Sequence, residues 1–147
     1  MKNRRLLITF IIIIAILLFI QVIPINRSNP PVLGEIQTPA EIYHLLQKSC
    51  FDCHSHQTNW PWYSRIAPVS WSVVHDVKEG RDHLNFSAWN KYNSREKIKI
   101  YEEIKEVLEK DEMPPAPYLW MHPAAKLTQE ELNRLFQWLN LSSGDTY

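Results

Sequence analysis

Apolar residues fall into one continuous block near the N-terminus and several shorter, periodic groups after it. Residues 6–20 are apolar except for Thr9, and further apolar residues extend the block to Ile25. A membrane-spanning helix needs ~20 predominantly apolar residues, or ~17 at the short end. The block is apolar on all sides, so it predicts a single transmembrane helix over residues 6–25 rather than a core helix.

The residues around this block predict its orientation. Lys2, Arg4 and Arg5 precede it, which favours a cytoplasmic tail over residues 1–5 and an exported chain after the helix. A cleaved signal peptide would end in a small-x-small site, and segment 21–27 contains none. We therefore expect an uncleaved signal anchor. Either reading places the rest of the chain outside the cytoplasm.

The exported part is predicted to begin with a linker and a capped helix. Residues 26–37 are proline-containing and lack periodicity, which is typical of a linker. Thr38 and Glu41 are spaced as a capping box, and Pro39 stands at the first helical position. The first helix of the domain is therefore expected to run to about Lys48.

Helical spacing continues in three further segments. The first runs from Val69 to about Lys78, with Gly80 near its end. The second runs from a cap at Asn93 or Ser94 to about Lys110. The third begins at a second capping box formed by Thr128 and Glu131. No segment has a convincing strand pattern. The sequence thus predicts an all-α domain over residues 38–141, followed by a tail over 142–147, with the first and last helices packed together.

Composition favours a helical domain, and the charge balance does not suggest a polyanionic partner. Ten prolines and only three glycines favour helices joined by stiff loops over a β-sandwich. The formal net charge is zero; without Lys2, Arg4 and Arg5 the 16 basic residues become 13 against 16 acidic ones, a net of −3. This balance gives no indication of nucleic acid binding.

The motif with the clearest chemistry is Cys50-Phe51-Asp52-Cys53-His54, which contains both cysteines of the chain. Two thiols at this spacing can add across the two vinyl groups of one haem, and the following histidine then becomes the proximal iron ligand. A disulfide is the alternative in an exported chain. A thioredoxin-like dithiol lacks its βαβ setting, and a zinc site with His54 or His56 lacks a second ligand pair. Covalent haem c is the favoured prediction.

The order of these parts resembles a class I cytochrome c over residues 38–141: a helix, the C-x-x-C-H motif, a Met113-Pro114-Pro115 loop and a capped last helix. Segments 59–64, 66–71 and 80–89 also resemble a bacterial family described as haem-binding domain proteins. The resemblance implies a cytochrome c-like helical domain around a covalent haem, exported from the cytoplasm. It implies no particular reaction.

His54 is expected to bind iron through Nε2 while its Nδ1–H donates to a backbone carbonyl. By resemblance to cytochromes c, that carbonyl would come from a proline loop, with Pro68 the first candidate and Pro61 the second. On the distal side Met113 is the favoured ligand, since two prolines stiffen the loop after it. Open alternatives are Met121, His75, His83 and His122.

Aromatic and basic residues supply further candidates for the haem site. Trp71 is expected to form part of the pocket wall, together with Trp60, Trp62, Trp89 and Trp120. Arg81, and with it Arg65, could pair with the haem propionates.

Taken together, these features predict a membrane-anchored monohaem c-type cytochrome that transfers single electrons between exported redox partners. It would be a single-pass protein of a bacterial inner membrane, with no small-molecule substrate. An open or labile distal site would favour two alternatives, a haem-based gas or redox sensor and a peroxidase-like enzyme. Carbon monoxide binding separates the carrier from both.

Overall fold

The computed structural model describes residues 2–144, and all of its regular elements are helices. The α-helices are α1 (Lys2–Phe19), α2 (Ala40–Ser49), α3 (Phe51–His54), α4 (Val69–His83), α5 (Ser94–Glu109), α6 (Ala116–Met121) and α7 (Gln129–Ser143). Short 3-10 helices are η1 (Ile20–Val22), η2 (Trp62–Arg65), η3 (Trp89–Lys91) and η4 (Pro123–Ala125). The predicted all-α fold class is confirmed.

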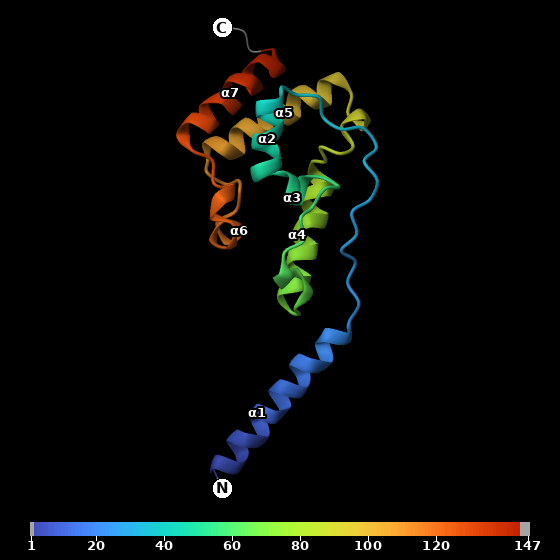
Figure 1. Cartoon of the computed structure of the whole chain (residues 1–147), viewed down its shortest axis with the longest axis vertical. Coiled ribbons are helices and arrows are strands. Elements are labelled where there is room, and N and C mark those ends of the chain that lie inside the picture. The colour runs from blue at the N-terminus through green and yellow to red at the C-terminus, as the bar shows by residue number, and fades with distance from the viewer. Residues whose placement is uncertain (1, 145–147) are drawn as a thin grey trace.

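Helix α1 stands apart from the other helices, and none of its residues is buried (Figure 1). With η1 it forms a continuous helix from Lys2 to Val22 that is long and apolar enough to cross a membrane. It begins at Lys2, so most of the predicted tail over residues 1–5 is helical. Met1 lies outside the described residues.

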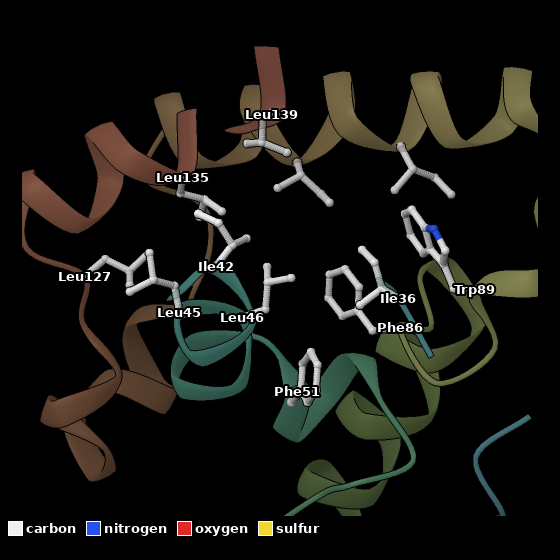
Figure 2. Close-up of a cluster of buried hydrophobic side chains, with 12 residues drawn as sticks. Ile36, Ile42, Leu45, Leu46, Phe51, Phe86, Trp89, Leu127, Leu135 and Leu139 are labelled. Carbon is white, nitrogen blue, oxygen red and sulfur yellow. The ribbon is translucent and has the colours of Figure 1, made fainter. Parts of the chain in front are cut away.

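The hydrophobic core lies where α2, α5 and α7 meet (Figure 2). Leu46 of α2, Leu135 and Leu139 of α7, and Ile100 and Ile104 of α5 are all buried in one cluster. Each helix contributes residues three to four positions apart, which lie on one face of a helix. The expected packing of the first domain helix against the last helix is confirmed.

Two of the three side-chain caps that the sequence predicts are present in the structure. Thr128 and Glu131 form the predicted capping box of α7. Asn93 is the cap of α5 and forms a further box with Glu96. In each box the side-chain oxygen of the cap accepts a hydrogen bond from the third backbone N–H of its helix.

The capping box predicted at Thr38 is wrong. Pro39 is the N-cap of α2 and has no capping side chain. The Thr38 hydroxyl donates to the Pro39 carbonyl, and the Glu41 carboxylate is paired with Arg134 of α7. The Glu41 carboxylate that the capping box would need is therefore bound by a residue of α7 instead.

The other differences from expectation concern the ends of segments. Helix α4 continues through Gly80 to His83, α6 was not foreseen, and α7 extends to Ser143 into the predicted tail. The last residues of that tail, 145–147, lie outside the described residues.

The predicted linker over residues 26–37 is bound to the domain, and its second half pairs with the backbone that follows α4. The backbone N–H groups of Leu33 and Ile36 donate to the carbonyls of Ser87 and Phe86. Ile36 is buried in the core cluster. The segment therefore adds to the domain that it was expected only to connect.

Candidate functional site

The C-x-x-C-H motif forms its own short helix, α3, directly after α2. Phe51 is buried against Phe86, and their ring centroids lie 5.5 Å apart. The backbone N–H groups of Cys53 and His54 both donate to the Cys50 carbonyl. The core side chain of Phe51 thus anchors one helical turn that carries both thiols and the imidazole.

His54 is held by two backbone carbonyls at the end of α4. Its Nδ1 lies 2.9 Å from the Gly80 oxygen and 3.2 Å from the Leu84 oxygen. Both partners can only accept, so Nδ1 carries the proton and donates it. In the neutral ring Nε2 then holds a free lone pair, which is the form that binds a metal.

Burial also favours the neutral form of this histidine. It lowers the pKa of the His54 imidazole below its ordinary value, although the Leu84 and Gly80 carbonyls act in the opposite direction. The imidazole therefore has both the tautomer and the protonation state of an iron ligand near neutral pH.

Gly80 allows this arrangement because it has no side chain. A Cβ built at Gly80 would lie 2.7 Å from the Cys53 carbonyl oxygen and 3.1 Å from the Cys53 Cβ. These contacts are too short for any other residue without a shift of the backbone. Gly80 therefore lets α4 approach α3 closely, and its own carbonyl orients His54.

The predicted proline acceptors for His54 are corrected by this geometry. The Pro68 carbonyl accepts the backbone N–H of Trp71, and the Pro61 carbonyl accepts from Ser64. Sequence reasoning missed Gly80 and Leu84 because carbonyls carry no side-chain signature. A lone glycine inside a helical pattern was the available signal, since such a glycine weakens the helix and often has a packing reason.

Both thiols are free, and their surroundings keep them protonated. Burial raises the pKa of Cys50 to about 12 and, with a smaller contribution from Asp52, raises that of Cys53 to about 11. Within residues 2–144 no three His, Cys, Asp or Glu side chains gather as they would around a zinc ion. The motif therefore fits thioether attachment of haem better than a zinc centre.

An aromatic cluster joins α6 to α3. The Tyr118 hydroxyl donates to the Asp52 carboxylate across 2.8 Å, and the Tyr118 ring stacks on His122 with centroids 4.3 Å apart. The Tyr63 hydroxyl lies 3.4 Å from Nδ1 of His122. Burial and the bond to Asp52 raise the pKa of Tyr118, so its hydroxyl remains a donor. The cluster holds the segment after α5 beside the haem motif.

A cavity of about 540 Å³ lies beside this cluster. Phe51 and Asp52 of α3 line it, as do Met121 and His122 at the end of α6. Two of the alternative distal ligands thus face one cavity with the central residues of the motif. None of the three sequence-predicted motif ligands, Cys50, Cys53 and His54, lines it.

The other distal candidates lie elsewhere. Met113 is in the loop between α5 and α6, 40% exposed, and it does not line this cavity. His75 and His83 are exposed on α4, and His75 lies 3.5 Å from Glu79. Among the described residues, no hydrogen bond or ion pair joins Met113, His75 or His83 to His54, although His83 lies near enough to help lower the pKa of the His54 imidazole.

Arg81 and the tryptophans also have positions that differ from expectation. The Arg81 guanidinium donates to the Ser55 and Ser28 carbonyls, to Asn29 and to Thr58, so it binds protein groups rather than being available for a propionate.

The tryptophans differ in exposure. Trp71 is partly exposed on α4. Trp89 is buried in the core, and Trp62 and Trp120 are the most exposed tryptophans.

Comparison with known proteins decides the class of cofactor. The model of the family described as haem-binding domain matches residues 15–141, which is most of the chain. The chain belongs to this haem-binding domain family. Neither the curated proteins nor the solved structures contain a match. The cofactor of this domain is haem, and the oriented imidazole of His54 with two free thiols is the set of residues that fits it.

Proposed function

We propose that this haem-binding domain protein is a membrane-anchored monohaem c-type cytochrome that transfers single electrons between exported redox partners. The observation that carries the proposal is the geometry of α3 and α4. One helical turn presents two free thiols, and two carbonyls leave Nε2 of His54 as its metal-binding nitrogen. When bound, haem supplies a one-electron iron couple.

Cys50 and Cys53 are the residues that would form the two thioether bonds, and His54 would be the proximal ligand. Phe51 keeps this turn fixed against the core, and Gly80 fixes the plane and tautomer of the imidazole. A rigid site suits electron transfer, because the protein then reorganises little when the charge of the iron changes.

The anchor proposal rests on α1 and the charges before it. A helix whose apolar side chains are all exposed requires an apolar environment, which a bilayer supplies. Lys2, Arg4 and Arg5 favour a cytoplasmic N-terminus. The haem domain would then lie on the periplasmic or extracellular side of a bacterial inner membrane.

Mass spectrometry of the purified full chain tests the cofactor proposal. We expect a mass one haem above that of the polypeptide, with peptides showing thioethers at both cysteines. The Cys53→Ala variant should lose one of the two thioethers. A chain with an intact Cys50–Cys53 disulfide and no haem would overturn the proposal.

Met113 remains the proposed distal ligand, and three variants test it. Replacing the true sulfur ligand with alanine should remove the weak red absorption band of a sulfur–iron(III) bond and lower the reduction potential, because a thioether favours ferrous iron. We expect this from Met113→Ala and not from Met121→Ala or His122→Ala. The same changes in Met121→Ala would reassign the ligand and leave the carrier function in place.

Carbon monoxide binding separates the carrier from the sensor and the peroxidase-like enzyme. A carrier with two protein ligands on the iron should show no spectral change with carbon monoxide until its distal ligand is removed. Avid binding by the unmutated protein would contradict electron transfer as the function.

A further inference from the structure

The haem domain is fixed directly to the exported end of the membrane helix. The side-chain amide of Gln21, in η1, pairs with both backbone groups of Ala67: its Nε2 donates to the Ala67 oxygen at 3.0 Å, and its Oε1 accepts the Ala67 N–H at 2.9 Å. A guanidinium nitrogen of Arg27 donates to the Ser64 carbonyl at 3.2 Å. The start of α4 is accordingly the part of the domain nearest α1 (Figure 1).

The length of the apolar helix places this junction at the membrane surface. Leu6 to Gln21 spans about 24 Å at ~1.5 Å per helical residue, which is shorter than a hydrocarbon core of ~30 Å. A short span is drawn into the bilayer, which thins around it. Gln21, and with it the residues around Ala67, would therefore lie at the depth of the lipid headgroups.

The residues around Ala67 expose large apolar side chains that the proposed haem site does not use. Trp62, Ile66 and Val69 are 68%, 47% and 50% exposed. Trp62 lies on η2, Ile66 directly follows it and Val69 begins α4, so the three lie on either side of the contact with Gln21. Tryptophan is enriched where membrane meets water, because its ring is apolar and its N–H can reach a polar partner.

Two arginines flank the same junction. Arg27 and Arg65 line a cavity of about 310 Å³ together with Gln21 and Ser70. Over the described part of the chain, the Arg65 side chain makes no hydrogen bond or ion pair. Guanidinium groups bind phosphate oxygens in a bidentate manner, so this pair is suited to the phosphates of phospholipids.

We propose that residues 62–69, together with Arg27 and Arg65, form a lipid-binding surface that docks on the bilayer spanned by α1. Trp62, Ile66 and Val69 enter the interface, and the two arginines bind headgroup phosphates. The haem domain is thereby held at a fixed height on the membrane. The inference rests on the proposal that α1 is a membrane anchor.

Photo-cross-linking of the full chain in vesicles tests this surface. Benzoylphenylalanine replaces Trp62 in one variant, Ile12 within α1 in a second, and Leu141 in a third. Leu141 is 66% exposed and belongs to α7, and that helix lies at the opposite end of the molecule from α1 (Figure 1). The vesicles contain phosphatidylethanolamine and phosphatidylglycerol with a fluorescent acyl chain. We expect strong lipid labelling at positions 12 and 62, severalfold above that at 141.

The labelling pattern separates this proposal from the anchor proposal. Label at position 12, with position 62 no higher than position 141, overturns the docking surface and leaves the anchor in place. No label at position 12 overturns both proposals. Circular dichroism confirms that each variant keeps its helices.

The role of the arginines has a separate test in the Trp62 photoprobe variant. Raising the fraction of phosphatidylglycerol should increase labelling at position 62, because the headgroup charge attracts the two guanidiniums. Arg27→Gln with Arg65→Gln should abolish that increase, and Arg95→Gln, on exposed α5, should leave it unchanged. An increase that persists in the double variant would show that the arginines do not bind lipid.

Discussion

At the scale of single residues, the proposed haem ligand His54 is oriented by backbone groups that have no chemical signature of their own. Its Nδ1–H is shared between the Gly80 and Leu84 carbonyls, and the Gly80 carbonyl also accepts the backbone N–H of Leu84. The end of one helix therefore orients the ligand carried by another. Hydrogen bonds of this kind raise the basicity of a ligating imidazole.

Gly80→Ala tests this orientation. The added Cβ meets the Cys53 carbonyl, so α4 must move away from α3 and the hydrogen bonds to His54 must lengthen. We expect a loss of about 1–3 kcal/mol in the free energy of unfolding, as is typical of overpacking. A less basic imidazole stabilises ferric iron less, so the reduction potential should also rise. Urea unfolding and redox titration measure the two effects.

Gly34→Ala is the matched control. There the three atoms nearest to the added Cβ belong to the side chain of Asn90, which is exposed and can rotate away at the cost of one hydrogen bond to the Leu33 carbonyl. We expect little change in stability and none in the potential. Equal reduction potentials in the two variants would show that Gly80 does not position His54.

At the scale of helices, identical local signals have different outcomes according to what packs nearby. Thr128 and Glu131 form their capping box, and Lys48 of α2 also pairs with the same Glu131 carboxylate at 2.8 Å. Thr38 and Glu41 have the same spacing, but Arg134 binds Glu41 and the box does not form. At the start of α7 the cap and the ion pair with Lys48 of α2 are both present. At the start of α2 the ion pair with Arg134 of α7 is present and the cap is absent.

Threonine-to-alanine substitutions distinguish the two helix starts. Thr128→Ala removes an oxygen that accepts from the backbone N–H of Glu131, so it should lower the free energy of unfolding by about 1 kcal/mol. Thr38→Ala removes no cap and should change it by less than ~0.5 kcal/mol. Thermal or chemical unfolding of the two variants measures the difference. Equal losses would mean that Thr38 acts as a cap in solution.

At the scale of the whole molecule, Arg81 connects the chain that follows α1 to the region of the C-x-x-C-H motif. Its guanidinium donates to the Ser28 carbonyl and to Asn29 on one side, and to Ser55 and Thr58 on the other. It also lies 6.0 Å from the Trp60 ring centroid. One side chain thus holds residues 28–29 against the segment directly after the haem motif.

Arg81→Gln should release this segment from the domain. A glutamine cannot reach all four acceptors, so residues 26–32 should exchange their amide hydrogens faster and become sensitive to proteases. Arg95→Gln, on the exposed face of α5, is the control and should leave both unchanged. Hydrogen exchange followed by mass spectrometry measures the effect. Unchanged protection in Arg81→Gln would show that the remaining contacts of the segment, such as those of Arg27 with Ser64 and of Asn29 with Thr58, hold it without Arg81.

The sequence by itself determined the features that depend on residues close together along the chain. The apolar block before Gln21, the amphipathic spacing of α5 and α7, and the C-x-x-C-H motif are all of this kind, because helix periodicity and cofactor attachment act over a few residues. The all-α class and the packing of α2 on α7 followed from the same patterns.

Only the tertiary structure decided which distant groups meet. It selected Gly80 and Leu84 over Pro68 as partners of His54, and it assigned Glu41 to Arg134 rather than to a cap. It also placed Arg81 within hydrogen-bonding distance of the chain that follows α1. Backbone carbonyls look alike in every sequence, and a charged side chain can satisfy only the partners that packing brings within reach, so these choices depend on the fold.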